Sequence, residues 1–391
     1  SDIVDDAEQL APAELRQRTR LLLRPHRPSP AARGSPRNRR SSPSLACADA
    51  EANPVLEAPL GHAPDVARLL ARAVATWDFD TLELAEATGG KPLCTLAMFL
   101  FQNLGLIDAC GLNKDVLVNF FTEIEAGYDG TLMYHNSSHA ASVMFMTHVL
   151  LERAGIAAAV ASFYGLSEGF VRMGCLVAAA LHDFEHLGVT NEFLQRSGHP
   201  RAAGNGGRHA NERHHFDAAM QVLARPECNF LRDLPAEELG RIRGLMETAV
   251  LATDMADHRL IVDAFGRALG PDPPAAFRPG CQEDAALLVQ MTLKCADLGH
   301  VALSWKAHVR WVERIEEEFF LQGDQERALG LSASFLMDRE KPGVSKSQVG
   351  FFEHMALPLF GAMARGAPGA RPLLEGVTSN YRRWKGIEAA R

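Results

Sequence analysis

The sequence predicts an all-α fold. From about Pro54 onward, apolar residues recur at the spacing of a helix, and few stretches alternate between apolar and polar residues as strands do. Segments rich in Gly, Pro or Asn, such as 197–207 and 270–280, separate the helical stretches and predict loops. We therefore expect one compact multi-helix domain that covers residues 54–391.

Three of the predicted helices are strongly apolar. Cys94–Ile107 carries too few polar residues for a surface helix, so we expect it in the core. Phe170–His186 is typical of a buried helix that ends in a cluster of ligating side chains. Glu283–Asp297 has its apolar residues in an i, i+4 row and delivers an aspartate at its end. The polar ends of these helices are therefore candidates for a functional site.

The first 53 residues differ in composition from the rest. The stretch Arg16–Pro43 is dense in Arg, Pro and Ser and almost free of acids, which predicts disorder for residues 1–53. A solvated tail is the favoured interpretation. An organelle-targeting segment is disfavoured, because the acids at positions 2, 5, 6 and 8 precede the basic stretch.

Composition and charge limit the partners and the compartment. A formal net charge of −8 with a pI of about 6.0 excludes general nucleic-acid binding, which needs a basic surface. The seven cysteines are scattered and form no Cys-x-x-Cys pair, so we expect a reducing, cytoplasmic location. No apolar run of about 18 residues predicts a membrane span. Because the chain begins with Ser1, we expect a fragment; membrane attachment elsewhere, an upstream regulatory domain and homodimerisation are left open.

Two histidines four residues apart lie in the stretch Tyr134–Val143, YHNSSHAASV. On a helix, residues at this spacing share one face, so we expect His135 and His139 to point the same way. A single histidine is usually packed or exposed to solvent, so the pair becomes notable only beside other ligating side chains.

Such side chains follow two of the apolar helices. The stretch ALHDFEHLG places His182, Asp183 and His186 after the first, and KCADLGH places Asp297 at the end of the second. Buried charges at helix ends are costly unless they are paired or bind a metal. Two imidazoles and two carboxylates form a mixed nitrogen and oxygen ligand set that suits divalent zinc, manganese or magnesium. The predicted ligands are His139, His182, Asp183 and Asp297.

This ligand set outlines a two-metal hydrolase site. Two ions about 3.5 to 4 Å apart can clamp the attacking and leaving oxygens of a phosphoryl displacement, and they lower the pKa of a shared water. A leaving alkoxide then needs a proton, which a histidine that titrates near neutrality can supply. His135 is the candidate for this general acid.

With these residues in view, the sequence resembles the class I 3′,5′-cyclic nucleotide phosphodiesterases. Tyr134–Val143 is similar to the family's Y-H-N-x-x-H-A-x-x-V, and His182–Asn191 is similar to H-D-x-x-H-x-G-x-x-N. The blocks NERHH, VLATDM and EEFFLQGD follow in family order, and the resemblance covers about residues 80–365. It implies an all-α, HD-type catalytic domain that hydrolyses cyclic AMP, cyclic GMP or both to 5′-monophosphates, and so terminates cyclic nucleotide signalling.

The resemblance implies a role for each candidate residue. His135 would donate the proton to the O3′ leaving group. The four ligands would hold the tighter ion, usually zinc, and Asp183 would bridge to a second ion, usually magnesium, with manganese as an alternative. Four further residues match positions that orient ligands, water and the general acid: His186, Glu212, Thr253 and Asp254.

The resemblance also implies a pocket for the purine base. Gln348 would hydrogen-bond the purine edge, while Phe351 and Ile315 would clamp the ring from its two faces. Without the resemblance, Phe351 would be taken for a core aromatic and Gln348 for a surface amide. Tyr134 and His300 complete the predicted substrate-binding set. His300 stands where many members have Asn, so the preference between cyclic AMP and cyclic GMP is left open.

Two other functions compete with this interpretation. An HD-type phosphohydrolase of another nucleotide would share the His-Asp metal chemistry, but it gives no reason for the blocks around Gln348. A catalytically dead nucleotide-binding regulator would have lost a ligand or the general acid, and none of these is missing. We therefore expect 3′,5′-cyclic-nucleotide phosphodiesterase activity.

Overall fold

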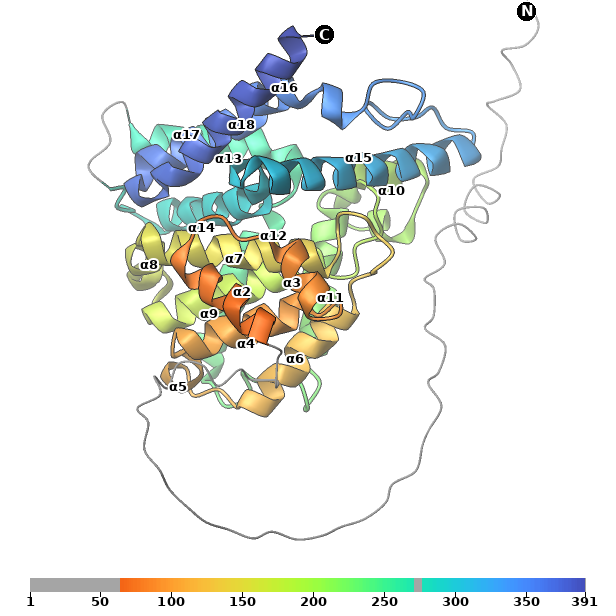
Figure 1. Cartoon of the computed structure of the whole chain (residues 1–391). Coiled ribbons are helices and arrows are strands. Elements are labelled where there is room, and N and C mark those ends of the chain that lie inside the picture. Colours follow the sequence, from red (N-terminus) through yellow and green to blue (C-terminus); the bar gives the residue numbers. More distant parts are fainter. Residues whose placement is uncertain (1–63, 271–275, 391) are drawn as a thin grey trace, which may run out of the picture.

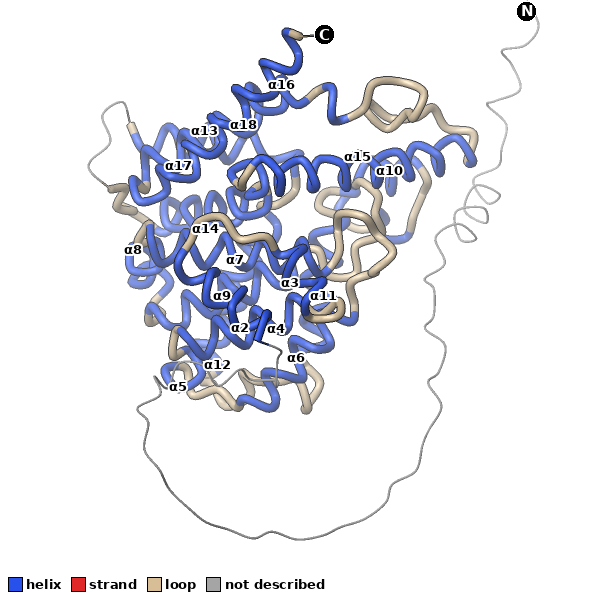
Figure 2. The backbone as a smooth tube through the Cα atoms, viewed as in Figure 1, coloured by secondary structure: helices blue, strands red, loops and turns tan. Residues whose placement is uncertain are grey.

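The structure, a computed structural model, describes residues 64–270 and 276–390, and every regular element in these ranges is helical (Figure 2). The predicted all-α fold is therefore confirmed. The predicted disordered segment 1–53 lies outside the described residues, and the domain boundary at residue 54 stays a prediction. Among the described helices, none is by itself long and apolar enough to cross a membrane.

The elements are named by their order along the chain. Those of the first half are α2 (Pro64–Ala75), α3 (Thr81–Ala87), α4 (Pro92–Asn103), α5 (Leu106–Ala109), α6 (Lys114–Ala126), α7 (Ser137–Arg153), α8 (Ile156–Tyr164), α9 (Glu168–Leu181), α10 (Asn191–Arg196), η2 (Pro200–Ala203) and η3 (Asn205–Gly207). Those of the second half are α11 (Ala210–Leu223), α12 (Ala236–Leu251), η4 (Met255–Asp257), α13 (His258–Leu269), α14 (Gln282–Asp297), η5 (Gly299–Ala302), α15 (Trp305–Ala328), η6 (Val344–Lys346), α16 (Gln348–Phe351), η7 (Phe352–Ala356), α17 (Leu357–Gly366), η8 (Pro368–Ala370) and α18 (Arg371–Ala389).

Four helices form the centre of the fold. α7 packs against α9 and α14, and α12 packs against the same two helices (Figure 1). The side chains of α7 are buried continuously from His139 to Leu151, because neighbours cover the helix on all sides. The long helix α15 lies over one end of this centre, where it contacts η5 and η6. Buried helices thus bring their polar ends toward a shared region.

The predicted core segment Cys94–Ile107 is confirmed as core. α4 is buried from Pro92 to Phe101 and packs against α6 and α7. The segment is not one continuous helix, because Gly105 adopts a φ of 64° and separates α4 from α5. A left-handed backbone conformation of this kind costs glycine nothing, but it cannot continue a helix.

The predicted helix Phe170–His186 ends earlier than expected, at Leu181. Residues 182–190 form a turn, in which Glu185 has a φ of 58° that no α-helix accommodates. The ligating side chains therefore lie in the turn that follows α9. α14 ends at Asp297, as predicted.

The expectation that His135 and His139 share one helical face is wrong. α7 begins at Ser137, because the side chain of Asn136 caps the helix by accepting from the backbone N–H of Ser138 at 2.9 Å. The N-cap position has an extended backbone, so His135 precedes the helix and only His139 lies in its first turn. The two rings still lie near each other, with centroids 5.8 Å apart and planes at 81°.

The two predicted loops differ in detail. Segment 197–207 contains the short turns η2 and η3 between its irregular residues. Within segment 270–280, residues 271–275 lie outside the described ranges. The six cysteines in the described residues are all free.

Candidate active site

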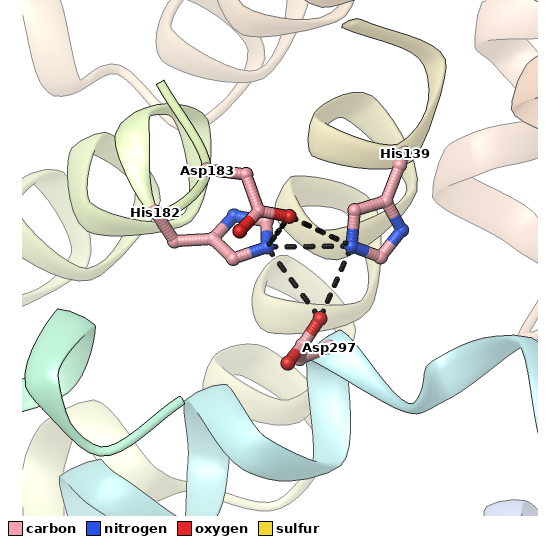
Figure 3. Close-up of side chains that lie close together, drawn as sticks. All are labelled: His139, His182, Asp183 and Asp297. Atoms are coloured by element: carbon pink, nitrogen blue, oxygen red, sulfur yellow. Dashed lines mark hydrogen bonds and ion pairs between the residues drawn. The ribbon is translucent and has the colours of Figure 1, made fainter. Parts of the chain in front are cut away.

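Four side chains from the ends of three helices converge on one point (Figure 3). The Nε2 atoms of His139 and His182 lie 3.3 Å apart. Asp183 Oδ2 lies 3.1 Å from Nε2 of His182 and 3.4 Å from Nε2 of His139. Asp297 Oδ1 lies 3.1 Å from Nε2 of His139 and 3.5 Å from Nε2 of His182. The structure thus brings all four predicted ligands together.

The cluster has the donor atoms and the spacing of a metal site. His182 Nδ1 donates to the carbonyl of Ala179 at 2.9 Å, so Nε2 is the nitrogen that faces the other three side chains and would bind a metal there. One ligand atom from each of the four residues lies within 4.8 Å of the others. A single divalent ion can span distances of this size. Two imidazoles and two carboxylates in this arrangement therefore fit a divalent cation.

The electrostatics of the cluster favour a positive charge at its centre. Burial lowers the pKa of His182, but the charges of Asp183 and Asp297 outweigh burial and raise this pKa well above its usual value. Burial raises the pKa of Asp183, yet the nearby His182 and His135 hold it well below its usual range. For His139, burial dominates and lowers the pKa. The carboxylates are thus ionised at neutral pH, and a cation between them is stabilised.

His135 is fixed beside this cluster by Glu318 of α15. His135 Nδ1 hydrogen-bonds Glu318 Oε1. Glu318 Oε2 accepts from the backbone N–H groups of Tyr134 at 2.8 Å and of His135 at 3.1 Å. Burial lowers the pKa of His135, but the charges of Glu318 and Asp183 raise it to about 9. The imidazole therefore holds a proton at neutral pH, and its Nε2 is left for a ligand.

A cleft of about 510 Å³ opens next to the cluster. Asp183, Asp297 and His135 lie in its wall, whereas His139 and His182 are themselves buried. The five predicted substrate-binding residues also line it: Tyr134, His300, Ile315, Gln348 and Phe351. The cleft thus joins the ligand cluster to the predicted base pocket.

Gln348 lines this cleft and has one side-chain polar atom without a partner among the described residues. The side chain is 3% exposed, and its Nε2 donates to the carbonyl of Val344 at 3.2 Å. Because a carbonyl can only accept, this bond fixes the orientation of the amide. Gln348 Oε1 is buried and has no hydrogen-bond partner among the described residues. It is therefore free to accept a hydrogen bond from a ligand.

Residues 134–377 match the family model described as "3'5'-cyclic nucleotide phosphodiesterase". The chain belongs to the 3′,5′-cyclic nucleotide phosphodiesterase family. The match covers the ligand cluster, His135 and the cleft residues, and it confirms the resemblance noted from the sequence motifs.

Two curated relatives agree with this membership. The chain is 35% identical over 302 residues to "Dual specificity calcium/calmodulin-dependent 3',5'-cyclic nucleotide phosphodiesterase 1" of Drosophila melanogaster. The matched region covers 77% of this chain and 34% of that protein. It is 31% identical over 312 residues to "3',5'-cyclic-AMP phosphodiesterase 4C" of Mus musculus. This matched region covers 79% of this chain and 44% of that protein. The chain therefore spans less than half the length of either relative.

A solved structure shares the fold. The phosphodiesterase domain of Salpingoeca rosetta rhodopsin phosphodiesterase superposes with a TM-score of 0.72 and 25% sequence identity. The superposition covers 84% of this chain and 96% of that domain. The helical arrangement described above is thus that of a phosphodiesterase domain.

In this member of the family, the predicted orienting residues lie near the cluster. His186 stacks on His135, with ring centroids 4.0 Å apart, and its Nδ1 accepts from the backbone N–H of Gly188. Burial and the charge of Asp254 raise the pKa of Glu212 to about 7. Glu212, Thr253 and Asp254 all lie in the wall of the cleft. The structure thus gathers the orienting set around the same opening.

An amide and a histidine hold two of these acids in place. Asn191 Nδ2 donates to Glu212 Oε2 at 2.9 Å and lies 3.4 Å from Asp254 Oδ2. Asp254 Oδ2 also lies 2.9 Å from His209 Nδ1. These contacts fix both carboxylates in the wall of the cleft.

Glu318 and His215 also belong to this region but were not predicted from the sequence. Glu318 is the buried member of three consecutive glutamates, and it lies seven positions after the buried Trp311 on the same face of α15. This spacing in the sequence indicates that Glu318 faces the core with Trp311. His215 Nδ1 donates to the carbonyl of Phe184 at 2.5 Å, and its Nε2 lies 3.8 Å from Asp183 Oδ1. His214 precedes it directly in the sequence, and nothing in the sequence shows which of the two imidazoles faces the cluster.

Proposed function

We propose that this chain hydrolyses 3′,5′-cyclic nucleotides to 5′-nucleoside monophosphates and so terminates cyclic nucleotide signalling. The observation that carries the proposal is the convergence of four ligands beside His135, which Glu318 holds at the wall of the cleft. Membership of the phosphodiesterase family supports it, as do the activities in the names of the two relatives.

We further propose that His139, His182, Asp183 and Asp297 would hold a zinc ion and that Asp183 would also contribute to holding a magnesium ion, with manganese as an alternative. When bound, these ions supply Lewis acidity for the phosphoryl group and activate water at neutral pH. The directions of the two Asp183 oxygens support a role for this carboxylate in holding both ions. Oδ2 faces His139 and His182, while Oδ1 faces His215. A carboxylate in this position can serve two ions at once.

His135 is the proposed general acid. Its Nδ1 is occupied by Glu318, so the proton on Nε2 is the one available to the leaving O3′ atom. The hydrogen bonds from Glu318 to the backbone of Tyr134 and His135 hold the ring in the wall of the cleft.

The base is proposed to lie between Ile315 and Phe351, with its edge against Gln348. All three side chains line the cleft, and Gln348 Oε1 lacks a partner there. An amide oxygen can accept from the amino group of adenine or from the N–H groups of guanine. This pocket therefore supports recognition of a purine without choosing between the two.

Side-by-side kinetics test the function. The values of kcat/KM for cyclic AMP and cyclic GMP are measured with and without a chelator, and the product is identified by chromatography. We expect turnover of at least one substrate to its 5′-monophosphate, loss of turnover with chelator, and recovery when zinc and magnesium are returned. Turnover of neither substrate by the metal-loaded protein would overturn the proposal.

Replacing Gln348 by Ala (Gln348→Ala) is expected to raise KM about tenfold with little change in kcat. A lost hydrogen bond in a buried pocket costs about 1.5 kcal/mol, which corresponds to this factor. Gln282→Ala, which removes an exposed glutamine at the start of α14, is the matched control and should behave as wild type. Equal KM values in both variants would remove Gln348 from the base pocket.

Replacing Glu318 by Gln (Glu318→Gln) is expected to lower kcat about tenfold, since a hydrogen bond to a charged group is worth about 1.5–3 kcal/mol. It also removes a negative charge that raises the pKa of His135, so this pKa falls. The alkaline limb of the pH profile of kcat/KM should therefore move to lower pH. The exposed Glu313 of the same helix gives the control Glu313→Gln. An unshifted profile in Glu318→Gln would contradict this role.

Three statements about the wider protein stay proposals. We propose a cytoplasmic catalytic domain that takes cyclic nucleotides as substrate and does not bind nucleic acid. Homodimerisation and an upstream regulatory domain stay open. The net charge of −8 supports the proposal that the chain does not bind nucleic acid.

A further inference from the structure

His300 is the cleft residue whose surroundings are most unusual. It lies in η5, lines the cleft and is 8% exposed. Its Nδ1 points away from the cleft, toward Nδ1 of His308 on α15, at 3.2 Å. The planes of the two rings lie within 15° of each other. A contact between two imidazole nitrogens requires that one donates and the other accepts.

The next contact decides the direction. Trp384 of α18 places its Nε1 2.8 Å from Nε2 of His308, and His308 is fully buried. An indole N–H can only donate, so Nε2 of His308 accepts. In a neutral imidazole the proton then lies on Nδ1, which faces Nδ1 of His300 at 3.2 Å, and the ring of His308 also hydrogen-bonds the backbone of His300. His300 in turn carries its own proton on Nε2, the nitrogen on the opposite side of the ring.

Both rings are neutral in this environment. Burial is the main cause that lowers the pKa of His308 to about 4. Burial, followed by the charge of His308, holds the pKa of His300 well below its usual value. With both rings neutral, Trp384 is the donor in its hydrogen bond with His308, and His308 is the donor in its hydrogen bond with His300.

We propose that Trp384 and His308 are positioning residues that lock His300 as a fixed N–H donor to the base of the bound cyclic nucleotide. This inference rests on the proposed function and adds to it how the base is read. Neither Trp384 nor His308 lines the cleft, and His300 is the cleft residue that His308 contacts through a polar atom. Adenine and guanine each carry acceptor atoms on the base edge, including N7 in both and O6 in guanine.

The lock has a consequence for selectivity. An asparagine amide can turn over and present either a donor or an acceptor, whereas the locked imidazole presents a donor alone. A base group that itself donates would leave two buried donors facing each other, which is costly. The site therefore selects for an acceptor on the base opposite His300 and against a donor there.

Two substitutions at His308 separate this role from packing. His308→Gln keeps the direction of the contacts, because its oxygen can accept from Trp384 and its amide nitrogen can donate to His300. His308→Leu leaves His300 Nδ1 buried without a donor. We expect KM for cyclic AMP and cyclic GMP to rise about fivefold or more in His308→Leu, with kcat changed less than about twofold. His308→Gln should keep a KM near that of wild type.

Histidine ¹⁵N NMR tests the lock without any turnover. The metal-loaded wild-type protein is labelled on histidine nitrogens, and His300→Asn assigns the His300 signals. We expect a protonated Nε2 and an unprotonated Nδ1 on His300, and a shift of the Nε2 signal when 5′-AMP or 5′-GMP is added. The His308→Leu spectrum should lose this single tautomer.

Specific outcomes overturn the inference. A proton on Nδ1 of His300 in the wild type would do so, and so would equal KM values in His308→Leu and His308→Gln. These outcomes are distinct from failure of the proposed function, which appears as a lack of cyclic nucleotide hydrolysis by the wild-type protein.

Discussion

Replacing His135 by Ala (His135→Ala) is expected to lower kcat for cyclic nucleotides by about 100- to 10,000-fold, the range that general acid catalysis contributes. The leaving O3′ alkoxide would lose the protonated imidazole that Glu318 holds beside the ligand cluster. Metal content should stay near that of the wild type, because His135 contacts Glu318 and is not one of the four ligands.

The measurement combines steady-state kinetics with metal analysis on the same protein sample. The exposed His354 supplies the matched control His354→Ala, which should change neither quantity. Turnover in His135→Ala equal to that of the wild type would end the assignment of His135 as general acid. A large loss of metal in that variant would also contradict it, since it would make His135 a ligand.

Replacing Asp297 by Ala (Asp297→Ala) is expected to abolish both metal binding and turnover. Asp297 Oδ1 faces the Nε2 atoms of His139 and His182, so its loss removes one quarter of the donor set (Figure 3). Loss of a partner outside the ligand set typically costs about 10- to 100-fold in metal affinity, and loss of a ligand should cost more. We therefore expect kcat below detection until metal is supplied in large excess.

Zinc affinity measured by competition with a chromophoric chelator checks this result. Glu283→Ala removes an exposed acid from the same helix and should bind metal as wild type does. Thermal unfolding of the apo forms separates loss of metal from loss of fold. Wild-type zinc affinity in a folded Asp297→Ala protein would exclude Asp297 from the metal site.

The fold and the ligand cluster were predictable because they depend on local patterns. Apolar helical spacing predicts where α9 and α14 run, and polar residues at the ends of buried helices mark the cluster. His135 was placed wrongly on the helix, because the cap made by Asn136 overrides a spacing argument. A cap signal of Asn before Ser-Ser was present in the sequence and outweighs the i, i+4 rule there.

The rest of the site depends on tertiary contacts that no local pattern encodes. Glu318 accepts from the backbone N–H groups of residues 134 and 135, which lie 184 and 183 positions before it in the sequence. His308 of α15 contacts His300, and Trp384 of α18 contacts His308. Sequence spacing predicts which side chains face inward, but not which of them meet.

The most direct test of the metal centre is an anomalous difference map at the zinc edge, from crystals of the wild-type protein grown with zinc and magnesium. We predict a peak bound by Nε2 of His139, Nε2 of His182 and one oxygen each of Asp183 and Asp297, at about 2.0 to 2.2 Å. A map without a peak at this point, or with zinc held by other side chains, would contradict the account.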